Sequence, residues 1–263
     1  MNRIIKALFL LLVVASFSFS DLLADQKQFA RSYTAYTLPA NALEFEFWQR
    51  GNIGKENGYF YQWKPRFEIE YGVTDRLTAS MYFNLEETKS SENNFESEPL
   101  SFSTTSVELR YRLSNPNQYW IDPALYFELS YGGSEISYEP KLILSKRMGE
   151  FISVLNISSE IERNPMTSET VSDFEIGAGL AYELNKNVSI GIELSNHRNF
   201  SSILSNETGS ATFIGPTISF KTDRLYLVMN LMPQVSGSPA ASSGLDLIGH
   251  EKYEFRTILG IEL

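Results

Sequence analysis

The sequence predicts an all-β protein, a single antiparallel transmembrane β-barrel of about 12 strands that follows a cleaved signal peptide. Three observations lead to this prediction: an export signal at the N-terminus, long segments in which apolar and polar residues alternate, and connections that alternate between short and long. The 263 residues include 14 Tyr, 18 Phe and 3 Trp. Disordered chains are poor in such residues, so this composition favours a folded chain with a large apolar surface.

Residues 1–20 have the three parts of a secretory signal peptide. Arg3 and Lys6 form a basic start, residues 7–17 form an apolar core, and Ser18 and Ser20 are small residues that suit a cleavage site. Cleavage after Ala24 is the alternative. The apolar core is shorter than the roughly 20 residues that a membrane-spanning helix needs. We therefore expect an exported chain, with residues 21–41 as a periplasmic N-terminal segment and residues 42–263 as the barrel.

Alternation with a period of two residues predicts the strands. In residues 59–72 the odd positions are mostly aromatic or aliphatic, whereas the even positions include Gln, Lys, Arg and Glu. The pattern recurs in residues 43–50, 107–113 and 252–263. Most segments reach the roughly 9 to 11 residues that a tilted membrane-crossing strand requires. The expected strands are residues 42–50, 59–72, 76–87, 101–113, 118–132, 135–146, 149–162, 170–184, 188–198, 209–221, 224–235 and 250–263.

The connections between these segments alternate in length along the chain. Short connections rich in turn residues are expected at 73–75, 114–117, 147–148, 185–187 and 222–223. Longer connections fall at 51–58, 88–100, 164–170, 199–209 and 236–249, while residues 133–134 form a tight turn where a long loop is expected. An even number of strands with short turns at one end and long loops at the other is typical of outer-membrane barrels.

Aromatic residues gather at both ends of the apolar strand face. Those nearest the short connections are Tyr71, Tyr111, Tyr119, Phe151, Tyr182 and Phe220, and those nearest the long connections include Tyr59, Tyr61, Tyr131, Tyr138, Phe174 and Tyr253. Aromatic belts of this kind mark the two membrane interfaces, and a soluble sandwich has no reason to form them. Five prolines also lie within expected strands, where we expect β-bulges: Pro65, Pro123, Pro140, Pro216 and Pro233.

The polar strand face is expected to line the barrel lumen. The candidate lumen residues are Lys64, Arg66, Glu68, Glu70, Glu108, Arg110, Arg112 and Arg256. In one interpretation, rings of charge line a narrow aqueous path and set its selectivity. In the other, opposite charges on neighbouring strands pair and fill the interior, because a barrel of this size lies between filled and open barrels. The excess of carboxylates favours cations or neutral solutes if a path exists.

Several short motifs resemble a known group of barrels. They are Thr37–Ala40 (TLPA), Leu43–Trp48 (LEFEFW), Glu70–Leu77 (EYGVTDRL), Tyr111–Leu113 (YRL) and Ser145–Gly149 (SKRMG). Together they resemble poorly characterised Gram-negative outer-membrane β-barrels with a YGVTDRL turn, similar to transporters of the MetA-pathway-of-phenol-degradation type. The resemblance implies an exported barrel that passes small organic solutes, and it supplies no catalytic residues.

The composition leaves little material for enzyme chemistry or nucleic-acid binding. The chain has no Cys, only two His and a net charge of −10, so it offers no basic patch for phosphates. His197 shares a strand face with Ser195, but Asn199 stands where outer-membrane phospholipases carry their nucleophilic Ser. The acidic segment 86–98 lacks the ligand spacing of a calcium loop. We therefore expect no catalytic residue, metal site or cofactor.

These observations favour a narrow porin-like channel or uptake barrel for small solutes in the outer membrane of a Gram-negative bacterium. A non-conducting structural or surface-loop interaction barrel is the first alternative, and a phospholipase-like hydrolase is the second. The expected partners are outer-membrane lipid and lipopolysaccharide, the barrel assembly machinery during biogenesis, and a small solute.

Overall fold

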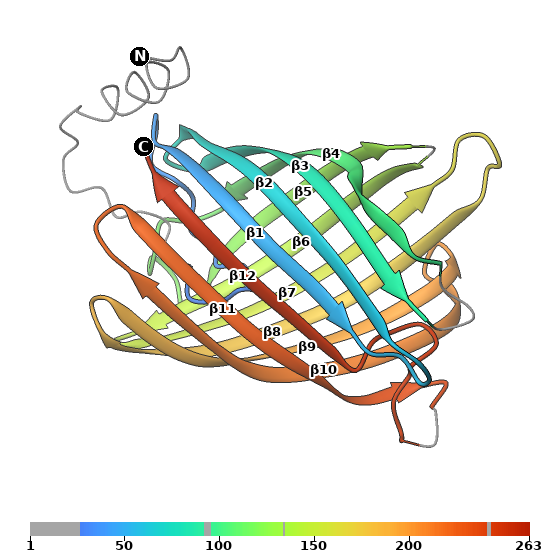
Figure 1. The fold of residues 1–263 in the computed structure, drawn as a ribbon. Coiled ribbons are helices and arrows are strands. Elements are labelled where there is room, and N and C mark those ends of the chain that lie inside the picture. The colour runs from blue at the N-terminus through green and yellow to red at the C-terminus, as the bar shows by residue number, and fades with distance from the viewer. Residues whose placement is uncertain (1–26, 92–95, 134, 241–242) are drawn as a thin grey trace, which may run out of the picture.

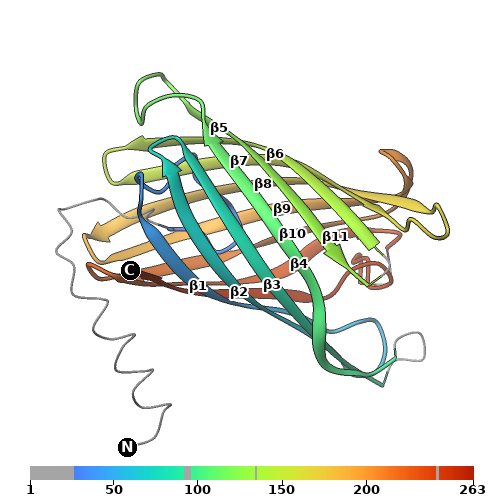
Figure 2. The same ribbon diagram turned by 90° about the horizontal axis from the view of Figure 1, so that it is seen from above.

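The protein forms one closed β-barrel. The computed structural model describes residues 27–91, 96–133, 135–240 and 243–263. Within these ranges, twelve antiparallel strands pair in sequence order and β1 pairs with β12 to close the barrel (Figures 1 and 2). The predicted fold class and strand number are confirmed. In the described part of the chain, no helix has the length and apolar character needed to cross a membrane. The predicted signal peptide lies outside the described residues.

The strands contain between 10 and 17 residues. They are β1 (Leu43–Ile53), β2 (Phe60–Thr74), β3 (Leu77–Ser90), β4 (Glu98–Arg112), β5 (Asp122–Gly132), β6 (Glu135–Met148), β7 (Phe151–Arg163), β8 (Thr170–Asn185), β9 (Val188–Ser202), β10 (Ser205–Lys221), β11 (Leu225–Ser238) and β12 (Tyr253–Glu262). The first and last strands meet along their whole length, from Glu44 opposite Glu262 to Ile53 opposite Tyr253.

Two connections differ from the sequence prediction. Residues 113–121 form a loop at the short-turn end, where Asn117 adopts a φ of 58° and its N–H donates to Asp122 at 2.8 Å. At the opposite, long-loop end, the expected loop 199–209 is instead a continuation of β9 and β10 that turns at residues 203–204. A positive φ of 46° at Leu204 closes this turn, so the hairpin extends past the predicted strand ends.

Only one of the five strand prolines lies near a bulge: the β10–β11 register shifts between Gln234 and Ser236, next to Pro233. Pairing on the two sides of Pro65 keeps one register, with Trp63 opposite Glu87 and Arg66 opposite Asn84. Other register shifts lie away from the prolines, for example between Gly72 and Thr74 at a turn. A proline lacks one backbone donor. The long strands tolerate this local loss because the pairs on either side remain formed.

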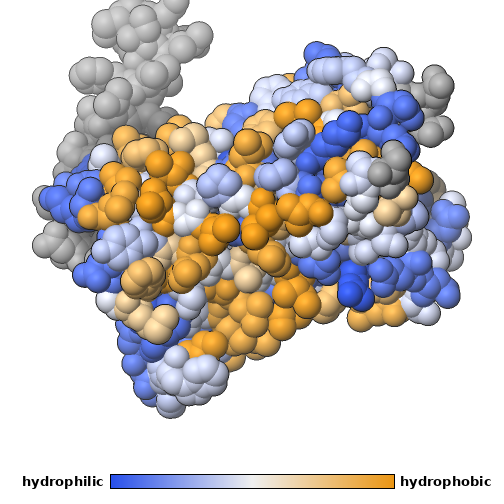
Figure 3. All heavy atoms as spheres, turned by 90° about the horizontal axis from the view of Figure 1, so that it is seen from below, coloured by the Kyte–Doolittle hydropathy of each residue, from blue (hydrophilic) through white to orange (hydrophobic). Residues whose placement is uncertain are grey.

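The outer surface is apolar over most of the strand length. Exposed aliphatic residues include Ile69, Leu109, Leu129, Leu155, Ile192 and Leu259. The predicted aromatic residues Tyr71, Tyr111, Tyr119, Phe151, Tyr182 and Phe220 are exposed near the short turns, and Tyr59, Tyr131, Tyr138 and Tyr253 are exposed near the other end. Figure 3 shows hydrophobic residues across the middle of the barrel and hydrophilic residues toward its ends. Such a band suits contact with lipid hydrocarbon.

The N-terminal segment enters the barrel. The sequence prediction placed residues 21–41 outside the barrel as a periplasmic segment, but residues 28–35 and Leu38 are buried and bonded to the inner wall. Parts of this blue segment are visible behind β1 in Figure 2. Residues 27–38 are called the plug segment below. This part of the segment therefore lies inside the lumen, and the first strand begins at Leu43.

Candidate functional site: the barrel lumen

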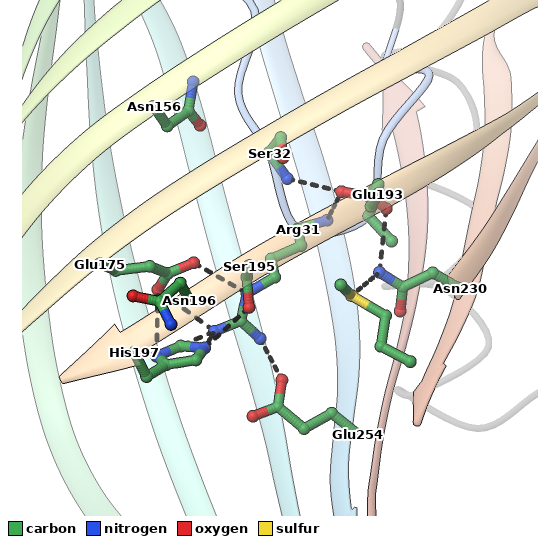
Figure 4. Close-up of polar contacts among 12 residues, drawn as sticks. Arg31, Ser32, Asn156, Glu175, Glu193, Ser195, Asn196, His197, Asn230 and Glu254 are labelled. Atoms are coloured by element: carbon green, nitrogen blue, oxygen red, sulfur yellow. Dashed lines mark hydrogen bonds and ion pairs between the residues drawn. The ribbon is translucent and has the colours of Figure 1, made fainter. Parts of the chain in front are cut away.

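One carboxylate on β9 holds the middle of the plug segment. Glu193 accepts hydrogen bonds from the backbone N–H groups of Ala30 at 3.0 Å, Arg31 at 2.9 Å and Ser32 at 2.8 Å (Figure 4). Asn230 donates a further bond to Glu193 at 2.9 Å. Successive backbone donors converging on one buried carboxylate satisfy the charge without a cation. Glu193 therefore fixes the position of the segment along the lumen.

Further wall residues bond to the backbone that follows. Asn156 on β7 accepts from the N–H of Tyr33 at 2.6 Å and donates to its carbonyl at 2.9 Å. The N–H of Ala35 donates to Ser145 at 3.0 Å, and that of Leu38 donates to Thr78 at 2.9 Å. Buried backbone groups need such partners. The lumen side chains therefore supply the hydrogen-bond partners that a neighbouring strand would otherwise give to this backbone.

Apolar contacts also hold the plug segment against the inner wall. Phe29 packs in a cluster with Ile152, Val154 and Ala181, all on the inner wall. A second cluster joins the plug segment to five strands and contains Ala30, Tyr33, Ala35, Trp48, Ala124, Tyr126, Ile143, Tyr226, Val228 and Ile258. Gly179 leaves room for Phe29, since a Cβ at this position would lie 2.6 Å from the Phe29 ring. Small and apolar lumen residues thus form a matching surface.

Arg31 is the tip of the plug segment and carries most of its charge contacts. Its Nε donates to Glu175 on β8 at 2.8 Å, and its Nη1 pairs with Glu254 on β12. Its Nη2 also contacts the Nε2 atom of His197 (Figure 4). One guanidinium therefore links β8, β9 and β12 across the lumen.

Ser195 and His197 also meet at this point. The Ser195 Oγ lies 2.9 Å from His197 Nε2, and His197 Nδ1 lies 3.6 Å from Glu175. This order resembles a nucleophile, base and orienting acid. However, Ser195 is fully buried, and Arg31 contacts the same His197 nitrogen that a base would use. The arrangement serves to anchor Arg31.

Two connected regions of free volume lie between the plug segment and the long-loop end. Each is about 360 Å³, and both are lined by Arg31, Arg50, Lys64, Glu139, Glu160, Glu175 and Arg256. The first also reaches Tyr33, Trp48 and Arg66. We call this charged space the vestibule. A volume of this size falls within the range of small-molecule sites. Arg31 and its neighbours form the floor of the vestibule.

The predicted site residues separate into three places. Lys64, Arg66 and Arg256 line the vestibule. Glu68, Glu70, Glu108 and Arg110 are buried deeper in the lumen beside the plug segment. Arg112 lies at the short-turn end, where it donates to the carbonyl of Asp75 at 2.8 Å. The structure therefore does not gather the eight predicted residues into one selectivity zone.

The deeper carboxylates share few cations. Lys27 pairs with Glu46, and Arg110 pairs with Glu70 and lies 3.4 Å from Glu108. Tyr226 donates to Glu44 at 2.6 Å. Side chains and the plug segment pack closely here, and a cavity beside Lys27, Trp48 and Arg110 holds about 10 Å³. In the described residues, no three His, Cys, Asp or Glu side chains are grouped as metal ligands.

The vestibule also contains residues that sequence reasoning missed. Arg31 was outside the predicted barrel, and Arg50 was recognised as polar without being assigned to the site. The anchoring role of Glu193 was equally missed. One signal was available: lumen positions in β7, β11 and β12 include Ile152, Val154, Val228 and Ile258, which an open aqueous channel does not explain.

Three solved structures have the same fold. The COG4313 outer membrane channel from Pseudomonas putida F1 gives a TM-score of 0.67 at 14% identity, over 87% of this chain and 98% of that chain. The NanC porin gives 0.56 at 10% identity, over 83% and 100% of the two chains. The KdgM porin, in complex with disordered oligogalacturonate, gives 0.53 at 12% identity, over 84% and 99%. The fold is therefore that of outer-membrane channels and porins.

Sequence comparison identifies the family. No curated protein matches the chain. A family model described as a family of unknown function, DUF6662, matches residues 21–263, which include the plug segment and all twelve described strands. The chain therefore belongs to DUF6662, a family of unknown function.

Proposed function

We propose that this protein is a narrow porin-like channel for uptake of small polar solutes across a Gram-negative outer membrane. The observation that carries the proposal is the charged vestibule inside a barrel with an apolar outer surface. A lumen built only for structural support would gain more from apolar packing than from unshared charges. The plug segment restricts passage below the vestibule, so transport depends on its partial displacement.

The similar structures support this proposal through their fold and their printed names, which describe a channel and porins. The YGVTDRL turn at residues 71–77 supports a closer link to transporters of the MetA-pathway type, which we also propose.

Outer-membrane lipid and lipopolysaccharide would contact the apolar band, and the barrel assembly machinery would insert the chain. We further propose removal of residues 1–20 on export, with cleavage after Ala24 as the alternative; the mass of the mature protein tests this.

A non-conducting barrel is the main competing function. The filled lower lumen favours it, because residues 28–35 are buried against the wall. A hydrolase is favoured only by the contact between Ser195 and His197. Arg31 contacts the same Nε2 atom of His197 that would have to accept the serine proton. We therefore propose that the protein is not an enzyme.

Reconstitution in planar bilayers tests the proposed function. The protein should first show heat-modifiable migration on a gel, which establishes that the barrel is folded. We expect small conductance steps with the full mature chain and a measurable reversal potential in a salt gradient. Folded protein that gives no current, and no solute entry in liposome swelling, would contradict the proposal and favour the non-conducting barrel.

A further inference from the structure

Three cations form a row on one wall of the vestibule. Arg50 on β1 lies directly opposite Arg256 on β12 and directly opposite Lys64 on β2. All three side chains line the vestibule. Like charges at directly opposed positions destabilise a sheet unless another group compensates them. This row therefore needs an anionic partner.

The carboxylates that lie nearest Arg50 and Arg256 already pair with other arginines: Glu128 with Arg66, and Glu175 and Glu254 with Arg31. Lys64 lies 3.8 Å from Glu86, whereas no ion pair within the described ranges includes Arg50 or Arg256. The Nε atom of Arg50 is buried without a hydrogen-bond partner. By contrast, Arg31, Arg66 and Arg110 each have a carboxylate partner. The row is therefore the part of the lumen whose positive charge is most available to a ligand.

Carboxylates line the opposite wall. Glu160 on β7 lies directly opposite Asp173 on β8, and Glu139 on β6 also faces the vestibule. Lys141 compensates one of these charges through its contact with Glu139 at 3.1 Å. Strand β7 lies six strands from β1 in both directions around the barrel. The acidic wall therefore faces the basic row across the vestibule.

Two facing walls of opposite charge select for a solute that carries both charges. A simple anion is attracted by Arg50 and Arg256 but repelled by Glu160 and Asp173, and a simple cation meets the reverse arrangement. A small zwitterion can place an anionic group at the basic row and an ammonium at the acidic wall. Each charge then gains a charge-assisted contact in a partly desolvated space.

We propose that the vestibule is a recognition site for small zwitterionic solutes of the amino-acid type. The carboxylate of the solute binds at Arg50, Arg256 and Lys64, and its ammonium binds at Glu139, Glu160 and Asp173. This proposal deepens the porin-like function proposed above and rests on it for its transport role. The floor formed by Arg31 holds the solute above the plug segment.

The first experiment measures binding without requiring conduction. The full mature chain in detergent micelles is examined by saturation-transfer NMR with four probes of similar size: γ-aminobutyrate, butyrate, butylammonium and butyramide. We expect γ-aminobutyrate to bind about tenfold more tightly than each of the others. Equal signals for all four probes, or stronger binding of butyrate, would overturn the proposal. The second result would identify a simple anion site.

Matched variants connect this preference to the two walls. The double variant Arg50→Gln/Arg256→Gln should lose the preference for γ-aminobutyrate. The control Lys89→Gln/Arg198→Gln removes two cations whose side chains are more than half exposed, and it should retain the preference. Conversely, Glu160→Gln/Asp173→Asn should shift the preference to butyrate. An unchanged preference in the Arg50 and Arg256 variant, with a heat-modifiable barrel, would contradict the proposal.

Liposome swelling separates this inference from the proposed function. Faster entry of γ-aminobutyrate than of the other probes supports both. Entry of all probes at similar rates supports the channel and overturns zwitterion selectivity. No entry of any probe contradicts the channel, and the NMR preference then decides the inference by itself.

Discussion

The two halves of the lumen are built from the same alternating strands, but one half is an open charged space and the other is filled. Toward the long loops, the inward residues are mostly charged and surround the vestibule. Toward the short turns, the inward residues include Ile152, Ala181 and Ile258, and they pack against the plug segment. The comparison teaches that a polar-in, apolar-out pattern predicts a barrel, but the size and polarity of each inward residue decide whether the lumen is open or filled.

The largest expected effect is the loss of stability when an arginine of the filled half is replaced, compared with an arginine of the vestibule. Arg110→Ser removes the cation beside Glu70 and Glu108, which are both fully buried, so stability should fall by about 3–5 kcal/mol. Arg66→Ser leaves Glu128 bonded to Tyr126 and Ser130, and should cost only about 1–2 kcal/mol while raising conductance. Denaturant unfolding in bilayers measures both costs. Equal costs would show that the two halves do not differ as described.

The outer surface provides the reference for this comparison. Leu109 is 46% exposed on β4, three residues before the strand ends at Arg112, so Leu109→Arg should place a charge in hydrocarbon near the interface and cost about 1–3 kcal/mol. The control Leu109→Met keeps the surface apolar. If the Arg variant matched the parent in detergent-free bilayers, the lipid and lumen faces would be inverted.

Two glycines on β8 test how the plug segment packs against the inner wall. Gly179→Ala should displace Phe29, whereas Gly177→Ala meets its nearest atom, the Oγ of Ser32, at 3.6 Å and should be tolerated. Overpacking at Gly179 should cost about 1–3 kcal/mol. Because the chain has no Cys, maleimide labelling of a single Ser32→Cys substitution reports release. Labelling should rise with Gly179→Ala only; equal labelling of the two glycine variants would contradict this packing.

The smallest effect is expected at the Ser195 hydroxyl. Ser195→Ala removes one hydrogen bond to His197 and should cost about 0.5–1.5 kcal/mol without changing conductance. A fluorophosphonate probe should fail to label the parent protein. Labelling of the parent that disappears in the Ala variant would favour the hydrolase over the channel.

The barrel was predictable from the sequence because its rules are local and repeated. Alternation placed the lipid-facing residues correctly from Ile69 to Leu259, and aromatic residues marked both strand ends. The number of strands followed from the segments, since each one must cross the same thickness. The loop 113–121 and the long β9–β10 hairpin were misjudged because turn residues alone do not show where backbone pairing stops.

The plug segment was not predictable in the same way. Its residues pair with no strand and instead bond to Glu193, Asn156 and Thr78, which lie far apart in sequence. No periodic pattern encodes such contacts. Likewise, Lys64 and Arg256 were recognised as lumen residues, but their row with Arg50 required the register of three strands. The sequence assigned the candidate residues to the polar face of the strands. Only the closed barrel shows which of them line the vestibule and which lie in the filled part of the lumen.

One measurement addresses the central claim that the plug segment closes a porin-like lumen. Residues 27–38 are replaced by a Gly/Ser segment of equal length, which keeps the chain length but removes the side-chain contacts of Arg31 with Glu175 and of Phe29 with its apolar cluster. Single-channel conductance is then compared with that of the parent, using heat-modifiable migration to confirm folding. We predict a conductance increase of several-fold, because the lower lumen becomes continuous with the vestibule. A folded variant whose conductance equals that of the parent would contradict the account.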